Sequence, residues 1–283
     1  MAPPRGWASC ARRRPTARVR LYCFPYAGGG LAAYQPWAAR LPDSVEVWTV
    51  CLPGREHRLD EAARTDLNGL VDELRAALAP QLAGPPAPVA FFGHSLGALL
   101  AYELARDLRA HGDREPAALV LSGRAAARHP PRRRMHTLDD DAFVAAVRSL
   151  GGAPSAALEH PELRELCLPT LRADITAAET YRHRPGPPLD CAITSWAGDA
   201  DEGVPPDAVA EWARHTRGPT RHRLFPGGHF FPWSAPGVLA ALAEDIGVQG
   251  RPPVNAYGRE GSPSHARPTP AGSPQDILRG TGA

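Results

Sequence analysis

Residues 89–97 read Val-Ala-Phe-Phe-Gly-His-Ser-Leu-Gly, and they are the most informative part of the chain. Its apolar start is typical of a buried strand, and the residues that follow it, Ala98 to Leu108, show a helical pattern. A G-x-S-x-G sequence between a strand and a helix indicates a sharp turn that exposes a serine hydroxyl, here that of Ser95. The two glycines are expected because a side chain at either position would clash with the neighbouring strand or helix.

Short apolar runs alternate with helical patterns on both sides of this turn. Such alternation predicts an α/β fold, with a mostly parallel central sheet and helices on both of its faces. The expected strands are residues 18–24, 45–51, 88–92, 117–122, 191–196 and 221–225. The expected helices of this pattern are residues 31–40, 67–82, 96–111, 207–215 and 238–246.

Three segments depart from the alternation. Residues 1–17 are rich in Pro, Arg and Ala, and residues 249–283 are rich in Pro, Gly and Ser, so we predict disordered tails around one domain at 18–248. Residues 125–188 contain no convincing strand but show helical patterns at 139–150 and 163–181. A helical insertion between two sheet strands, after the nucleophile, is where a lid would lie.

Composition excludes several classes of partner. The net charge of +2 is too small to indicate a nucleic acid, and no apolar run approaches the length that crosses a membrane. The five cysteines are scattered without a CxxC pair, which indicates neither a disulfide framework nor a zinc site. The N-terminal arginines precede no hydrophobic segment of a secretory signal. We therefore expect a cytoplasmic protein without cofactor or metal, and, since no coiled-coil pattern is present, a monomer.

Acidic residues and a histidine downstream of Ser95 can complete a nucleophilic site. A serine hydroxyl needs a base within hydrogen-bonding reach, and the base needs an orienting carboxylate. Asp199 and Asp201 both follow an expected strand, and His229 lies on a Gly-rich loop after the last one. The order Ser, Asp, His is that of α/β-hydrolases, so His229 is the candidate base and either aspartate the candidate orienter. His94, inside the turn, is expected to point away from the serine and pack.

Backbone amides are the candidate donors to the oxyanion. In this fold one donor is the N–H of the residue after the nucleophile, Leu96, and the other comes from the loop after an early strand. That loop reads Phe-Pro-Tyr-Ala-Gly-Gly-Gly over residues 24–30, and its consecutive glycines let amides point into the site. A phosphate-binding loop is disfavoured, because no Lys follows and the glycine spacing fits neither dinucleotide nor P-loop patterns.

These segments together resemble the stand-alone type II thioesterases that accompany non-ribosomal peptide and polyketide synthases. The matching segments are LYCFPYAGGG at 21–30, LPGREHR at 52–58, GHSLG at 93–97, LPTLRADITAAETY at 168–181, GDAD at 198–201 and FPGGHFF at 225–231. The resemblance implies a catalytic triad of Ser95, Asp201 and His229, with oxyanion donors from Ala27 and Leu96. The family's aspartate stands three residues after the glycine, which favours Asp201 over Asp199. The following residue, usually Pro, is Glu202 here, and we expect it only to adjust the loop.

The function that the resemblance implies is hydrolysis of acyl and aminoacyl thioesters on the phosphopantetheine arm of carrier proteins, removing stalled or wrong acyl groups. A carboxylic ester hydrolase or an acyltransferase of the same fold would share the triad. A non-catalytic scaffold that binds carrier proteins would not need it. Arg55 and Arg58 either form ion pairs near the site or contact the arm. At the level of the sequence these alternatives stay open.

Overall fold

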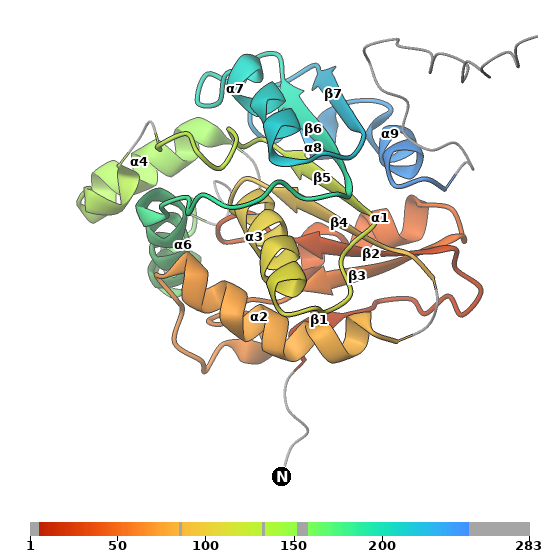
Figure 1. The fold of residues 1–283 in the computed structure, drawn as a ribbon. Coiled ribbons are helices and arrows are strands. Elements are labelled where there is room, and N and C mark those ends of the chain that lie inside the picture. The colour runs from red at the N-terminus through yellow and green to blue at the C-terminus, as the bar shows by residue number, and fades with distance from the viewer. Residues whose placement is uncertain (1–5, 85–86, 132–133, 152–157, 249–283) are drawn as a thin grey trace, which may run out of the picture.

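A seven-stranded sheet forms the centre of the computed structural model, which describes residues 6–84, 87–131, 134–151 and 158–248 (Figure 1). The strands are β1 (Ala8–Ser9), β2 (Val19–Phe24), β3 (Val45–Val50), β4 (Val89–His94), β5 (Ala118–Ser122), β6 (Ala192–Gly198) and β7 (Thr220–Phe225). Their spatial order is β1-β3-β2-β4-β5-β6-β7. All neighbours are parallel except β1 and β3, which confirms the predicted mostly parallel sheet.

Helices cover both faces of this sheet, as predicted (Figure 1). They are α1 (Gln35–Arg40), α2 (Leu67–Leu82), α3 (Leu96–Ala110), α4 (Asp140–Leu150), α6 (Pro161–Thr180), α7 (Pro206–Ala210), α8 (Phe231–Ser234) and α9 (Val238–Asp245). Successive side chains of β4 point to opposite faces. Phe91 therefore packs in the hydrophobic cluster of α2 and α3, whereas Phe92 packs in the cluster of α1 and α9.

The described part of the helical insertion expected between residues 125 and 188 contains α4 and α6, which lie together at one side of the molecule (Figure 1). A separate hydrophobic cluster joins them, with Phe143 and Val147 from α4 against Leu171 and Ile175 from α6. The C-terminal part of α6 belongs to the main core instead, through Ala177 and its neighbours. This insertion therefore has a core of its own and is anchored to the sheet domain at one end.

Residues 6–17 pack on the sheet, which differs from the disordered segment predicted for residues 1–17. β1 pairs with the end of β3, and Arg14 is buried. The Arg14 guanidinium donates to the carbonyl oxygens of Ala38 at 2.8 Å, Pro42 at 2.7 Å and Val45 at 2.6 Å. The sequence of this segment has no hydrophobic periodicity, because the segment is ordered by pairing with the edge strand β3 and not by an apolar face of its own. The predicted tail at 249–283 lies outside the described residues.

Two expected helices are each divided into a 3₁₀ turn and an α-helix. Residues 31–40 form a 3₁₀ turn at Leu31–Ala33 followed by α1, whose first turn contains Pro36. Residues 207–215 form α7 followed by a 3₁₀ helix at Glu211–His215. Further 3₁₀ turns lie at Glu56–Arg58 and Met135–Thr137.

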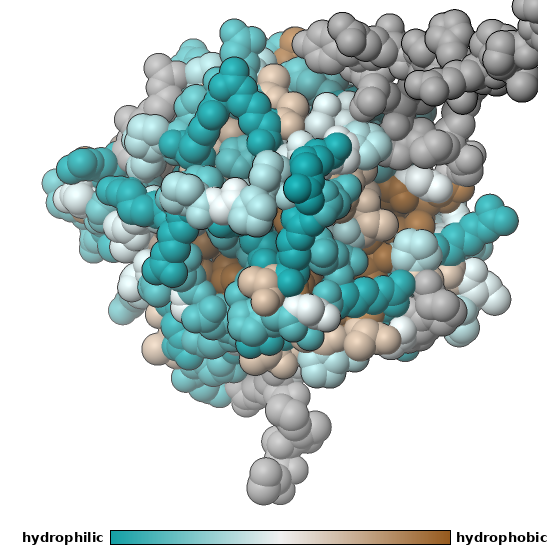
Figure 2. Space-filling model, viewed as in Figure 1, coloured by the Kyte–Doolittle hydropathy of each residue, from teal (hydrophilic) through white to brown (hydrophobic). Residues whose placement is uncertain are grey.

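The face seen in Figure 2 is covered largely by hydrophilic residues, with apolar side chains visible in recesses between them. Within the described parts of the chain, no helix combines the length and the apolarity needed to cross a membrane.

Candidate active site

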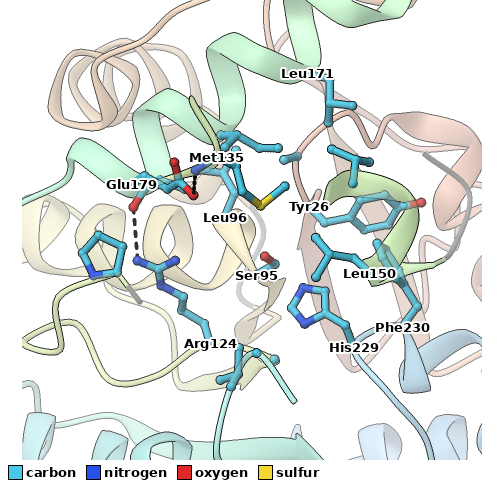
Figure 3. Close-up of a pocket in the computed structure, with 18 of the residues that line it drawn as sticks. Tyr26, Ser95, Leu96, Arg124, Met135, Leu150, Leu171, Glu179, His229 and Phe230 are labelled. Carbon is cyan, nitrogen blue, oxygen red and sulfur yellow. Dashed lines mark hydrogen bonds between the residues drawn. The ribbon is translucent and has the colours of Figure 1, made fainter. Parts of the chain in front are cut away.

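Ser95 lies in a strained turn between β4 and α3. Its backbone has φ 56° and ψ −115°, a conformation that residues other than glycine rarely adopt. A Cβ at Gly93 would lie 2.1 Å from the carbonyl oxygen of Gly97, and a Cβ at Gly97 would lie 2.1 Å from that of Phe24. Both glycines are thus required by close backbone approach, as the sequence predicts. The turn holds Ser95 at the wall of a pocket (Figure 3).

The pocket lies at the carboxyl ends of the parallel strands, where the connecting loops meet. Ala27 follows β2, Ser95 follows β4, Arg124 follows β5 and His229 follows β7, and all four line it. The register explains this grouping, because the N–H of Ser95 donates to the carbonyl oxygen of Ser122, at the end of the adjacent strand β5, at 2.9 Å.

Asp201, rather than Asp199, contacts His229. Nδ1 of His229 lies 2.7 Å from Oδ2 of Asp201, and both side chains are largely buried. The other Asp201 oxygen accepts from the amides of Gly203 at 3.0 Å and Val204 at 3.2 Å, which fixes the carboxylate. Asp199 instead accepts from the amide of Gly227 at 2.9 Å, so it holds the loop that carries the histidine.

Ser95 and the His229 ring lie next to each other on the same pocket wall (Figure 3). With Nδ1 directed at the carboxylate, Nε2 is the ring nitrogen available to the serine. The structure has no hydrogen bond between these two described side chains. Such bonds are often long before substrate binds and shorten in the complex. The arrangement thus holds the base and its carboxylate together beside an exposed hydroxyl.

The hydrogen bonds of the backbone amides indicate which of them can donate to the oxyanion. Leu96 is the first residue of α3, where an N–H has no partner within the helix. In the loop after β2, the amide of Gly28 donates to Asp174 Oδ2 at 2.8 Å and that of Gly29 to the Tyr26 carbonyl oxygen at 2.8 Å. Ala27, which lines the pocket, therefore remains the candidate donor of this loop.

A buried ion pair joins this loop to the insertion. Arg55 binds Asp174 of α6 through two hydrogen bonds of 2.8 and 2.7 Å, and it also donates to the Gly29 carbonyl oxygen at 2.9 Å. Asp174 is a residue that sequence reasoning did not single out, although it stands within a matching segment. Arg58 forms a separate ion pair with Glu61. For both arginines the structure bears out the ion-pair alternative.

His94 is fully buried and packs against the catalytic side of the sheet. Its Nδ1 lies 3.0 Å from Ser122 Oγ, and its ring stacks at a tilt on that of His229, with centroids 4.9 Å apart. Burial lowers the pKa of His94 well below 6.5, and the nearby His229 lowers it further. The packing of His94 is what the sequence analysis expects.

The remaining walls of the pocket are mostly apolar. Met135, Val147, Leu150, Leu171 and Ile175 come from the insertion and its approach (Figure 3). Two charged residues, Arg124 and Glu179, interrupt them. Sequence reasoning missed both. The available signal for Arg124 was its position two residues after an expected strand, at the same sheet edge as Ser95.

One group among the described residues has the spacing of a metal site: Cys51, Glu56 and His57. Burial, with Glu56 beside it, raises the pKa of the Cys51 thiol to about 12. Cys51 Sγ lies 3.5 Å from Glu56 Oε2, and the other Glu56 oxygen accepts from the Leu31 amide at 2.8 Å, so hydrogen bonds within the protein already engage this group.

Known proteins match nearly the whole described domain. Residues 19–247 match a family model described as a thioesterase domain. Over 225 residues the chain is 42% identical to the thioesterase PikA5 of Streptomyces venezuelae, covering 80% of this chain and 79% of that protein. The structure of RedJ, a thioesterase of the prodiginine pathway of Streptomyces coelicolor, superposes with a TM-score of 0.77 at 40% identity, over 86% of this chain and 91% of that one.

A further solved structure is that of BorB, a type II thioesterase from the borrelidin biosynthetic cluster. It matches with a TM-score of 0.73 at 37% identity, and the match covers 85% of this chain and 96% of BorB. The resemblance seen in the sequence is thereby confirmed. The chain belongs to the thioesterase family, among the type II thioesterases of polyketide and non-ribosomal peptide pathways, and is a hydrolase of thioester bonds.

Proposed function

We propose that Ser95, Asp201 and His229 form the catalytic triad, with which this thioesterase hydrolyses acyl and aminoacyl thioesters on the phosphopantetheine arm of carrier proteins. The observation that carries the proposal is the 2.7 Å contact of Asp201 with His229, which lines the same pocket as the strained Ser95. The biosynthetic clusters of the related thioesterases support carrier proteins as partners. The role is the removal of stalled or wrong acyl groups.

Acylation begins with attack of Ser95 Oγ on the thioester carbonyl carbon, while His229 takes the hydroxyl proton. The carbonyl oxygen becomes negative and accepts from the N–H groups of Leu96 and Ala27. Each such donor contributes about 3–4 kcal/mol to the transition state. The carbon–sulfur bond then breaks, and His229 gives its proton to the departing sulfur. A thiol, with a pKa of about 8.5, leaves as a weaker base than an alcohol.

Deacylation reverses these roles with water as the nucleophile. His229 takes a proton from the water as its oxygen attacks the carbonyl carbon of the acyl-Ser95 ester. The bond to Ser95 Oγ breaks, Oγ regains a proton from His229, and the free carboxylic acid leaves. Asp201 stabilises the protonated ring in both halves through its bond to Nδ1.

The same proposal includes acyl carrier and peptidyl carrier proteins as partners and a monomeric enzyme in the cytoplasm. All five cysteines are free, which is compatible with a reducing compartment.

The test is incubation of the enzyme with a panel of acyl- and aminoacyl-carrier proteins, with the intact mass of each carrier followed over time. We expect loss of the acyl mass with the wild-type protein and none above background with Ser95→Ala. Unchanged hydrolysis by Ser95→Ala would contradict the triad. A strong preference for a matched oxyester would indicate an ester hydrolase, and transfer of the acyl group to an acceptor other than water would indicate an acyltransferase.

A further inference from the structure

Arg124 occupies a fixed place beside the nucleophile. It follows β5 by two residues, and the last residue of β5, Ser122, accepts the Ser95 amide. Trp212 Nε1 donates to the Arg124 carbonyl oxygen at 2.8 Å, and this indole is fully buried. The backbone of Arg124 is thereby held, and its side chain lines the pocket on the side of Ser95 opposite His229 (Figure 3).

The Arg124 guanidinium has more donors than the protein uses. Its group carries five N–H donors. Within the described residues it makes one hydrogen bond, to the Ala178 carbonyl oxygen of α6 at 3.1 Å, and no ion pair with a carboxylate. Every acidic residue outside the described ranges lies in the segment 249–283. The charged head therefore reaches the pocket with most of its donors free.

Glu179, the nearest acidic side chain of the pocket, is occupied by other donors. Its carboxylate accepts from the amide of Met135 at 3.0 Å and that of His136 at 2.9 Å, and His136 Nδ1 lies 2.6 Å from it. These contacts hold Glu179 to the 3₁₀ turn rather than to Arg124. The polar part of the pocket is thus rich in donors and poor in acceptors.

An unpaired cation in such surroundings is costly without a partner. Burial lowers the pKa of Arg124 to about 10, although Tyr181 and the charge of Glu179 oppose this shift, and the guanidinium stays charged at neutral pH. Most of the other lining residues are apolar and can contact the hydrocarbon part of a substrate. Apart from the Ala178 carbonyl oxygen, no described oxygen accepts from the guanidinium, and Ser95, which would carry the acyl group, lines the same pocket.

We propose that Arg124 is a specificity-determining residue that binds a carboxylate or ketone oxygen on the acyl chain, so that oxygen-bearing acyl groups are the preferred substrates. This inference rests on the proposed thioesterase function and names its substrate class. Both oxygens accept hydrogen bonds of the kind that a guanidinium donates. A carboxylate can accept two parallel bonds from the guanidinium, and a ketone accepts one or two from a single oxygen.

The test compares pantetheine thioesters that differ only in the acyl chain. For chains of four and six carbons, a plain acyl group is compared with its 3-oxo form and with the form that ends in a carboxylate. The variants are Arg124→Met, which removes the donors at similar length, and Arg124→Lys, which keeps the charge. Arg128→Met is the matched control, because Arg128 pairs with Glu211 and does not line the pocket.

The readout is the ratio of kcat/KM between the oxygen-bearing and plain chains. For the wild type and for Arg128→Met we expect a preference of about 10- to 100-fold, the worth of a hydrogen bond to a charged group. Arg124→Met should bring the ratio close to one, and Arg124→Lys should retain part of a preference for the carboxylate. A preference for the carboxylate form alone, or for the 3-oxo form alone, identifies which oxygen Arg124 binds.

Two results would overturn the inference. One is a wild-type enzyme that shows no preference for oxygen-bearing chains at either chain length. This measurement does not depend on whether any variant folds. The other is a ratio of kcat/KM that is unchanged in Arg124→Met. This includes an equal loss of kcat/KM for all acyl chains, which would indicate that Arg124 binds the phosphopantetheine arm or anchors α6 instead. If no thioester is hydrolysed by the wild type, carrier-bound ones included, the proposed function itself fails.

Discussion

Asp201 and Asp199 are two residues apart in the sequence, yet their carboxylates have different hydrogen-bond partners. Asp201 contacts the His229 ring, whereas Asp199 accepts from a backbone amide of the histidine loop. We expect Asp201→Asn to lower kcat by about 10⁴-fold, because the amide favours the wrong ring tautomer. Asp199→Asn should lose far less, since the amide oxygen can still accept from Gly227. Steady-state rates on one acyl-carrier thioester measure both, and similar losses would contradict the assignment of Asp201.

Asp174 tests the link between the insertion and the oxyanion loop. Asp174→Asn leaves Arg55 buried and uncompensated, which should cost about 3–5 kcal/mol of unfolding free energy. It also weakens the bond that orients the Gly28 amide next to Ala27. We expect kcat to fall by more than KM rises, because the donor acts mainly on the transition state. Denaturant unfolding and steady-state kinetics are the measurements.

The control for this variant is Asp140→Asn. Asp140 pairs with Arg172 of α6 at 2.7 Å, but its side chain is 65% exposed. Exposed pairs contribute about 0–1 kcal/mol, so stability and kcat should stay near those of the wild type. If both aspartate variants behave alike, the buried pair has no special role in holding the loop.

The turn between β4 and α3 has no room for a side chain at Gly97. A Cβ at Gly97 would lie 2.1 Å from the Phe24 carbonyl oxygen and 2.8 Å from that of Pro25, and backbone atoms cannot move aside alone. We expect Gly97→Ala to destabilise the protein by at least about 3 kcal/mol, more than ordinary overpacking does. The change is measured by denaturant unfolding.

Gly112→Ala separates this clash from backbone strain. Gly112 has φ +70° but open space around it. Its substitution should cost only about 1–2 kcal/mol, the penalty of a left-handed conformation. Gly97 lies within α3 and has no positive φ, so a loss at Gly97→Ala no larger than that at Gly112→Ala would contradict the predicted clash with β2.

Sequence patterns predicted the elements that are defined by their own residues. The strand that ends in the serine turn, and the helix that follows it, appear where periodicity places them. The division of residues 207–215 into α7 and a 3₁₀ helix was not predicted, because the same apolar spacing permits both helix types over so short a stretch. β1, with two residues, exists only through pairing with β3.

The pH dependence of stability belongs to the whole molecule. Burial foremost lowers the pKa of His215 to about 4, and His94 is shifted in the same direction. Both rings stay neutral in the folded state while the unfolded chain takes up protons below about pH 6.5. Stability should therefore be complete above pH 6.5 and fall as the pH drops toward 4, by about 3 kcal/mol for His215.

The measurement is the free energy of unfolding between pH 7.5 and 4.5. We expect His215→Gln to flatten the loss relative to the wild type, even though the Tyr102 contact of His215 at 2.8 Å changes and lowers stability at every pH. A stability that rises on acidification would contradict the buried neutral histidines.

The residues of the candidate site could be predicted where short motifs follow the expected strands in the order of the fold. Ser95, Asp201 and His229 each follow a strand in the order of the fold, and the strands bring them to one edge. The contact of Arg55 with Asp174, 119 positions apart in the chain, follows from how α6 is laid over the oxyanion loop, which periodicity does not encode. The same holds for Arg124, whose free donors appear only once all its neighbours are placed.

The two attachments of α6 set how the entrance can widen. Its C-terminal part is shared with the main core, and its middle is held by Arg55. A swing of the whole insertion would break both contacts at once. The wall formed by Val147 and Leu150 belongs to α4, whose hydrophobic contacts are those of the smaller cluster. We therefore expect bulky acyl chains to be admitted by displacement of α4 alone. This one short helix would then set the upper size limit of the acyl groups that the enzyme hydrolyses.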